Sequence, residues 1–284
     1  MLIKRKRTLA VILLPITGGL AWPIKNKIMI QIKQQIAKSV AFSFVLGIAS
    51  CTQAQSTKPL QPEPGKGFAV IELFTSEGCS SCPPADRLIG NLQQENAGIP
   101  LYILSYHVDY WDHQGWKDRF SSKAWSQRQQ QYLQWLNLET LYTPQIVVNG
   151  KMENVGSDAK ATVSAINEAL GSEEQGTITM QATQKGAEIE VCYQFNGQIN
   201  GNSILLALVQ KNASSNVSAG ENTGKHLPHV QIVRAMEQED ASKDHRLLIK
   251  APGDFSTTGW ELIALVQNKK TGQIVSAAKS NINQ

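Results

Sequence analysis

Two cysteines separated by two residues, Cys79 and Cys82, most constrain how this chain folds. They follow a short, mostly apolar run at residues 68–74, which is typical of a buried parallel strand. Pro83 and Pro84 come directly after them, and proline suits the first turn of a helix, where its missing N–H costs no hydrogen bond. The sequence therefore predicts a strand, a polar turn and a helix, with the cysteine pair at the helix start.

A cysteine pair at this spacing is a redox pair, part of a metal site or a tight structural bridge. A structural zinc site needs about four ligands, and the chain has neither a second cysteine pair nor a spaced histidine pair, so we expect no metal or other cofactor. A thiolate at a helix N-terminus is stabilised by the helix dipole and by free N–H groups. We therefore predict disulfide exchange, with Cys79 as the exposed nucleophile, Cys82 as the resolving thiol, and Ser80 and Ser81 as substrate contacts.

The first 51 residues have the properties of an export leader. Residues 1–50 hold eight of the 27 basic residues and no acidic ones, which leaves 19 basic against 23 acidic side chains in the rest of the chain. That remainder has no basic patch for binding nucleic acid. Lys33 and Lys38 precede an apolar run, and the Ile48-Ala49-Ser50-Cys51 that follows resembles a bacterial lipobox. We expect lipidation of Cys51 and membrane anchoring in the periplasm or cell envelope; the alternative is a plain signal peptide.

A second apolar run, residues 8–24, lies ahead of this leader. It has 17 residues, including two prolines and two glycines, and is therefore marginal as a membrane span. We expect the true start at Met29, and the alternative is a real first transmembrane segment. Mass spectrometry that finds residues 1–28 in the expressed protein would contradict a start at Met29. Residues 52–67, rich in Gln, Pro, Ser and Lys, are predicted to be a flexible tether.

Strand and helix patterns alternate over residues 68–172, which predicts an α/β domain. The expected elements after the first strand are a helix at 83–96, a strand at 99–106, a helix at 121–138, a strand at 145–148, a tight turn at 149–150 and a helix at 157–170. Residues 107–142 are rich in aromatic side chains and carry four of the six tryptophans.

A polar cluster, His107, Asp109, Tyr110 and Trp111, follows the end of the predicted strand at 99–106. In an open α/β sheet, the carboxyl ends of the strands border the ligand crevice. These residues are therefore candidate substrate contacts, with His107 as a proton shuttle for the cysteines. The alternative is a small aromatic core with capping aspartates. Glu72, on the first strand, either assists the resolving thiol or faces a polar edge.

After a polar linker at 171–176, the pattern changes to strands separated by turns. The expected strands are 177–182, 188–195, 203–210, 229–235, 246–251, 261–267 and 273–280. This spacing without helices predicts an antiparallel β-sandwich domain at 177–281. Cys192 is expected to be a buried strand thiol. Whether Glu221, Asn222 and His226, in and just after the long polar loop at 212–225, dock onto the first domain stays open.

Four stretches, ELFTSEGCSSCPPAD, HVDYWDHQGWKDRF, YTPQIVVNG and SAGENTGKHLPHVQIVRA, resemble an uncharacterised bacterial family of secreted thioredoxin-like proteins, a domain of unknown function. The resemblance covers nearly all of residues 68–280. It implies a thioredoxin-like domain with an inserted aromatic-rich helical segment, followed by an antiparallel β-sandwich domain. It also implies that Pro144, preceded by Thr143, is cis and faces the cysteines. Unlike thioredoxin, the chain has no Trp before Cys79 and no Gly-Pro between the cysteines, which leaves the substrate and the direction of exchange open.

These observations predict an exported thiol–disulfide oxidoreductase that reacts with a protein dithiol or disulfide. The alternative is a non-catalytic extracytoplasmic binding or assembly lipoprotein in which the Cys79–Cys82 bridge is structural. A third hypothesis is a metallochaperone that holds Cu(I) with the two cysteines and His107, because soft thiolates suit Cu(I).

Overall fold

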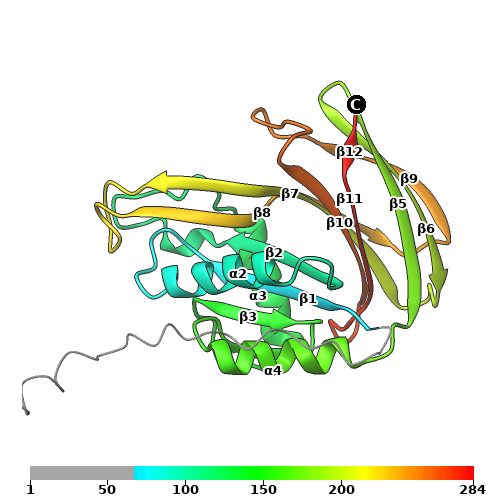
Figure 1. Cartoon of the computed structure of the whole chain (residues 1–284), viewed down its shortest axis with the longest axis horizontal. Coiled ribbons are helices and arrows are strands. Elements are labelled where there is room, and N and C mark those ends of the chain that lie inside the picture. The colour runs from blue at the N-terminus through cyan, green and yellow to red at the C-terminus, as the bar shows by residue number, and fades with distance from the viewer. Residues whose placement is uncertain (1–66) are drawn as a thin grey trace, which may run out of the picture. The chain divides into compact units, whose positions relative to one another are not determined.

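The computed structural model describes residues 67–284 (Figure 1). The predicted leader, the start at Met29, the lipidation of Cys51 and almost all of the tether lie outside the described residues. Among residues 67–284, none of the helices combines the length and the apolar character that a membrane-spanning segment requires.

Strands predominate over helices in this region (Figure 1). The first half contains β1 (Ala69–Thr75), α2 (Pro83–Glu95), β2 (Leu101–His107), the 3-10 helix η1 (Asp109–Trp111), α3 (Lys123–Trp135), β3 (Gln145–Val148), β4 (Met152–Val155) and α4 (Ala159–Leu170). The second half contains β5 (Gly176–Lys185), β6 (Glu188–Gly197), β7 (Asn202–Asn216), β8 (His226–Asp240), β9 (Asp244–Lys250), β10 (Trp260–Asn268), β11 (Ile274–Ser280) and β12 (Ile282–Asn283).

The helix starts follow from local chemistry. Ser122 caps α3, since its hydroxyl accepts a hydrogen bond from the N–H of Ala124 at 3.2 Å. Asp158 caps α4 in the same way, accepting from the N–H of Ala161 at 2.9 Å. In α2, Cys82 occupies the cap position and proline the first helical position, as expected. The predicted helices and strands of the first half are confirmed, with their ends shifted by up to three residues.

The strands form two sheets. The larger has eight strands in the order β11-β10-β7-β8-β2-β1-β3-β4, and the smaller has four in the order β12-β5-β6-β9. In the larger sheet, β1 and β2 are parallel, and β2 joins β8 in parallel through the pair Ser105–Ile232. The other neighbours in this sheet are antiparallel.

This topology shows that the predicted fold class, a thioredoxin-like α/β domain followed by an antiparallel β-sandwich domain, is wrong. Strands from both sides of the 171–176 linker share one mixed sheet. The reason is the hairpin of β7 and β8, whose strands have 15 residues each and therefore extend well beyond the predicted lengths. Its strand β7 pairs with β10, while its strand β8 pairs with β2. Residues 107–142 are also not a helical insertion throughout, since only η1 and α3 are helical there.

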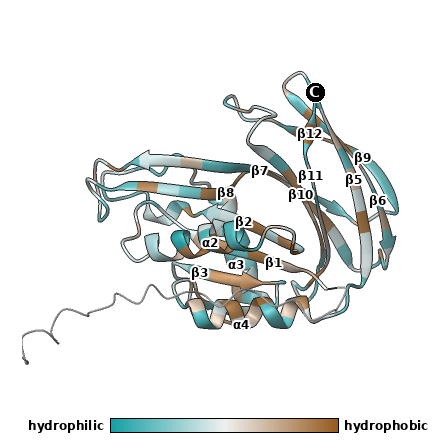
Figure 2. Ribbon diagram, viewed as in Figure 1, coloured by the Kyte–Doolittle hydropathy of each residue, from teal (hydrophilic) through white to brown (hydrophobic). Residues whose placement is uncertain are grey.

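Three hydrophobic clusters fill the space between these layers. One face of the eight-stranded sheet carries a cluster that includes Trp125 and Tyr132 of α3 and extends from β1 to Leu205 of β7 and Ile263 of β10. The opposite face packs against α2 and α4 at one end and against the four-stranded sheet at the other. Figure 2 shows the apolar colouring along β1 and β3. Residues 204–209 of β7 and 262–266 of β10 are buried on both faces, and these stretches are therefore continuous apolar runs rather than alternating ones.

Candidate functional site

The two cysteines form a disulfide in the turn between β1 and α2. Their Cα atoms are 5.4 Å apart, and Cys82 is the cap residue of α2. The turn is held by its own backbone, because the N–H of Cys79 donates to the carbonyl of Ser76 and the N–H of Cys82 donates to the carbonyl of Cys79, both at 3.2 Å. Neither cysteine is exposed, whereas Ser80 and Ser81 between them are. The expectation that Cys79 is exposed is therefore wrong for this state of the protein.

The segment around Pro144 meets the cysteine turn, as the family resemblance implied. The peptide bond between Thr143 and Pro144 is cis. The hydroxyl of Ser81 lies 3.4 Å from Sγ of Cys79 and donates to the carbonyl of Thr143 at 3.4 Å. The indole N–H of Trp111 donates to the hydroxyl of Thr143 at 2.8 Å. Four of the predicted site residues, Cys79, Ser81, Trp111 and Thr143, therefore lie together.

Trp111 also sets the course of the turn itself. A Cβ atom placed on Gly78 would lie 3.0 Å from Cβ of Trp111 and 3.1 Å from its carbonyl oxygen. A side chain at position 78 would therefore push the cysteine turn away from η1.

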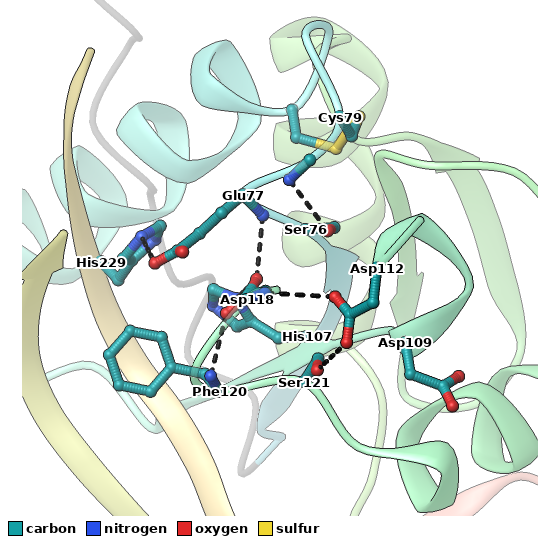
Figure 3. A network of polar contacts seen from close by, with 12 residues as sticks. Ser76, Glu77, Cys79, His107, Asp109, Asp112, Asp118, Phe120, Ser121 and His229 are labelled. Carbon is teal, nitrogen blue, oxygen red and sulfur yellow. Dashed lines mark hydrogen bonds and ion pairs between the residues drawn. A yellow bond between two sulfur atoms is a disulfide. The ribbon is translucent and has the colours of Figure 1, made fainter. Parts of the chain in front are cut away.

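A buried polar network lies beneath this turn (Figure 3). Nδ1 of His107, at the end of β2, is 2.6 Å from Oδ2 of Asp118, and both side chains are fully buried. Asp118 also accepts hydrogen bonds from the backbone N–H groups of Glu77 and Phe120, each at 2.9 Å. Because Glu77 stands two residues before Cys79, the carboxylate of Asp118 holds the cysteine turn in place.

The second half of the chain contributes to the same network through His229 of β8. Its Nε2 lies 3.2 Å from Oε1 of Glu77, and the indole N–H of Trp116 donates to Oε2 of Glu77 at 2.8 Å. The rings of His107 and His229 meet edge to face with 4.8 Å between their centres. The network therefore joins β1, β2 and β8 at the point where the two halves share the sheet.

Burial and neighbouring charges shift the pKa values of three side chains in this region, those of His107, Asp118 and Asp86. Burial works against the protonated form of His107, but the carboxylates around it, Asp118 foremost, outweigh that effect and raise the pKa of the imidazole. Burial alone would raise the pKa of Asp118, but His107 and the two backbone donors lower it. The two side chains therefore form an ion pair. On α2, burial raises the pKa of Asp86, against the opposing influence of His229 and His107.

Three polar atoms of this region have no hydrogen-bond partner within residues 67–284. They are Oγ1 of Thr75, Nε2 of His107 and Nδ1 of His229. Buried polar atoms are usually satisfied by protein or by water. In the same range, no group of three or more His, Cys, Asp or Glu side chains is arranged to hold a metal ion.

The tip of the β7–β8 hairpin, residues 217–225, covers the cysteine turn. The side-chain amide of Asn222 donates to the carbonyls of both Glu77 and Cys79, each at 2.9 Å. A carboxylate oxygen of Glu221 accepts from the N–H of Ser80 at 3.0 Å. Of the loop residues left open by the sequence, Glu221 and Asn222 therefore dock on the turn, whereas the exposed His226 contacts Asn216 of its own hairpin.

Other residues singled out in the sequence contact α3. The carboxylate of Asp109 accepts from the hydroxyl of Ser126 of α3 at 2.5 Å, and the exposed Tyr110 donates to Gln129 of α3, although its hydroxyl also interacts with the side chain of Thr143. Glu72 faces α3, where it pairs with Arg128 at 2.6 Å rather than assisting a cysteine. Cys192 is a partly buried free thiol in β6.

The roles of Glu77 and His229 were not predicted from the sequence. Glu77 is an acidic residue inside a turn of small polar residues, directly before the cysteine pair, and this was an available signal. His229 gave no comparable signal, because a histidine in a strand has no local feature that points to a partner far away in the sequence.

A family described as "Protein of unknown function (DUF1223)" matches residues 70–267. The chain belongs to this family. The matched residues of this DUF1223 protein include the cysteine turn, the polar network and the β7–β8 hairpin. No curated protein matches the chain.

Two solved structures resemble this DUF1223 protein over most of its length. Protein AGR_C_4864 from Agrobacterium tumefaciens is 27% identical with a TM-score of 0.58, and the likeness covers 77% of this chain and 95% of that one. HBP35 of Porphyromonas gingivalis is 15% identical with a TM-score of 0.55, covering 77% of this chain and 76% of that one, and is similar in fold alone. Both likenesses cover 77% of this chain, and each therefore includes strands on both sides of the 171–176 linker, which share one sheet here.

Proposed function

We propose that this DUF1223 protein is a thiol–disulfide oxidoreductase whose Cys79–Cys82 pair alternates between a disulfide and a dithiol. The observation that supports this best is the position of the disulfide at the N-terminus of α2. On reduction, the positive end of the helix dipole stabilises a thiolate, which is the reactive form of cysteine; the first two helical residues are prolines without N–H groups, so the dipole rather than hydrogen bonds supplies this effect.

The proposed reaction is an exchange of two electrons and two protons. A partner thiolate attacks one sulfur of the disulfide and forms a mixed disulfide, and the other sulfur leaves as a thiolate. A second partner thiol attacks the mixed disulfide, which releases the reduced pair and oxidises the partner dithiol. In the reverse direction, Cys79 attacks a partner disulfide and Cys82 resolves it.

The exposed groups beside the disulfide are the proposed substrate contacts. Ser80 and Ser81 are exposed between the cysteines, and Thr143 and Trp111 are hydrogen-bonded neighbours of this turn. Because Asp109 contacts α3, we assign it to positioning η1, whereas the exposed Tyr110, whose hydroxyl interacts with Thr143, is kept as a proposed substrate contact.

A second candidate is a binding or assembly protein in which the bridge is structural. The observation that favours it is the complete burial of both cysteines. An inert bridge of this kind needs no access for a partner.

A redox titration against glutathione separates the two candidates. For an oxidoreductase we expect a reduction potential above about −300 mV, within reach of the glutathione pool, whereas a structural bridge has a potential below about −300 mV. Quantifying the free thiols by mass spectrometry after acid trapping measures the equilibrium, with Cys192 replaced by serine to remove its thiol. A bridge that stays oxidised throughout would exclude the exchange function.

The roles of the two cysteines are tested by alkylation with iodoacetamide. We expect the labelling rate of Cys79 in Cys82→Ser to reach its plateau at a lower pH than a free thiol, whose pKa is about 8.5. The labelling rate of Cys82 in Cys79→Ser is expected to reach its plateau at the same pH as that of a free thiol or at a higher pH, since Cys82 lies within the buried start of the helix. Limited access of iodoacetamide to the buried sulfurs lowers both labelling rates, but it does not change the pH at which either rate is half-maximal. Identical profiles for the two variants would contradict the assignment.

We also propose that the protein acts outside the cytoplasm, because disulfides persist in oxidising compartments and residues 1–51 have an export pattern. Cell fractionation tests this, and recovery of the protein in the cytosolic fraction would contradict it.

A further inference from the structure

The β7–β8 hairpin extends beyond the sheet that anchors it. β7 pairs with β10 only up to Gln210, but it continues to pair with β8 as far as the Asn216–His226 pair. The projecting part runs over α2, where Val230 packs against the hydrophobic cluster that includes Leu88, Ile89 and Leu92 of this helix. Figure 1 shows this arm reaching away from the four-stranded sheet towards the end of the molecule that carries the cysteine turn.

The hairpin tip, residues 217–225, is held together by its own hydrogen bonds. The N–H of Gly224 donates to the carbonyl of Val217 at 2.8 Å, and the N–H of Val217 donates to the carbonyl of Lys225 at 3.0 Å. The ammonium of Lys225 donates to Oδ1 of Asn222 at 2.8 Å. Because these bonds lie within the tip, it can leave the cysteine turn as a unit without losing its own structure.

The contacts between the tip and the cysteine turn are few and polar. Asn222 is fully buried, and it supplies the two hydrogen bonds to the carbonyls of Glu77 and Cys79. The exposed Glu221 supplies the third, to the N–H of Ser80. The groups that flank Cys79 on both sides are thus occupied by the protein's own chain.

This arrangement conflicts with exchange chemistry unless the tip moves. A thiolate must reach a sulfur atom of the disulfide to attack it, and neither Cys79 nor Cys82 is exposed. We propose that the hairpin tip is a displaceable cover that closes the disulfide to thiols and opens when Asn222 and Glu221 release the cysteine turn. This inference rests on the proposed function and specifies how access to that site is regulated.

The test is the rate at which dithiothreitol reduces the Cys79–Cys82 bridge of the full chain. In Asn222→Asp, a carboxylate of the same shape replaces the amide and cannot donate to the two carbonyls. The loss of both hydrogen bonds shifts the equilibrium between the closed and the open tip towards the open state, and a tenfold shift corresponds to about 1.4 kcal/mol. We therefore expect reduction to be about tenfold faster than in the wild type, although the added negative charge disfavours an incoming thiolate.

Asn216→Ala is the matched control. Asn216 lies in the same hairpin, but its side chain contacts His226 rather than the cysteine turn. We expect its reduction rate to stay within about twofold of the wild type, since a single exposed hydrogen bond is lost. Equal acceleration in the two variants would show that general loosening of the hairpin is responsible and would overturn the proposal.

Glu221→Gln keeps the test valid if Asn222→Asp does not fold, because Glu221 is exposed. The amide retains an acceptor for the N–H of Ser80 but loses the charge that strengthens the bond. We expect faster reduction by both glutathione and cysteamine, which differ in charge. Acceleration by the anionic glutathione alone would indicate simple repulsion and would contradict the role of Glu221 as part of a cover.

Hydrogen exchange at the amide of Ser80 gives a measure of opening that does not depend on redox chemistry. We expect this amide to exchange about tenfold faster in Asn222→Asp, in proportion to the reduction rate. Different results would contradict the two proposals. A reduction potential of the Cys79–Cys82 pair far below the reach of the glutathione pool would exclude the oxidoreductase function. Unchanged rates of reduction and of hydrogen exchange in Asn222→Asp would exclude the cover.

Discussion

Replacing Arg128 with methionine is expected to destabilise the protein by about 3–5 kcal/mol, because it leaves Glu72 buried without its counter-charge. Nε of Arg128 lies 2.6 Å from Oε1 of Glu72, and the two side chains are 1% and 0% exposed. The guanidinium also donates to Tyr132 and Gln267. Methionine keeps much of the side-chain volume, so that the loss reflects the charge rather than a cavity. Urea denaturation at neutral pH measures the change in the free energy of unfolding.

Two further variants make this result specific. Arg246→Met removes an exposed partner of Glu190, with the arginine side chain 69% exposed, and is expected to cost less than about 1 kcal/mol. The double variant Glu72→Gln with Arg128→Met removes both charges and is expected to recover most of the lost stability. If Arg128→Met stays within about 1 kcal/mol of the wild type, the ion pair does not contribute as argued.

The same network predicts that the two halves of the chain unfold together. Glu72 belongs to β1, Arg128 to α3 and Gln267 to β10. The amide of Gln267 donates to the hydroxyl of Tyr132 at 3.0 Å, which links the last third of the chain to the first helices. A buried network of this kind is lost as a whole rather than in parts.

Asp118→Asn is expected to have the second largest effect, a loss of about 3 kcal/mol that depends on pH. The substitution removes the buried partner of His107 and one acceptor of the backbone N–H groups of Glu77 and Phe120. Because Glu77 precedes the cysteines, we also expect faster hydrogen exchange in the turn. Asp240→Asn, at an exposed pair with Lys269 in which the aspartate is 83% exposed, is the control and should cost less than about 1 kcal/mol.

The pH dependence follows from the two pKa shifts. The pKa of His107 is raised in the folded protein, so its contribution is complete below its ordinary pKa of about 6.5 and is lost as the pH rises through the raised value. The pKa of Asp118 is lowered, so its contribution is complete above its ordinary pKa of about 3.9 and is lost as the pH falls through the lowered value. The advantage of the wild type over Asp118→Asn should therefore be largest between about pH 4 and pH 6.5.

Unfolding in urea across the pH range tests this window. The neighbouring groups Glu77, Asp86 and His229 are present in both proteins, so the comparison reports the removal of the Asp118 carboxylate together with its electrostatic coupling to His107 and Asp86. A difference that does not change with pH would mean that Asp118 acts only as a hydrogen-bond acceptor for the backbone.

Local features of the chain were predictable because their causes are local. The start of α2 at two prolines, the turn at Asn149-Gly150 and the caps of α3 and α4 depend on residues within a few positions of one another. The seven strands predicted for the second half correspond to β5 to β11, since each of them is bounded by turn residues.

The architecture was not predictable in the same way. The pair Ser105–Ile232, which merges the two halves into one sheet, joins residues far apart in the sequence. A signal did exist in the uninterrupted apolar runs at residues 204–209 and 262–266, because a strand of an ordinary two-layer sandwich alternates apolar and polar residues. Such runs indicate that both faces of the strand are covered, but not by what.

The sequence by itself determined the cysteine pair and its position at a helix start, because these follow from spacing and from backbone chemistry, whereas the proline segment that meets the pair was implied by the family resemblance. Only the tertiary structure decided that Asp118, Glu77 and His229 meet beneath the disulfide and that Asn222 closes over it. Those contacts join β1, the segment after β2 and the β7–β8 hairpin, and they arise from the packing of the shared sheet. No local pattern in the chain specifies that packing, which is a property of the whole fold.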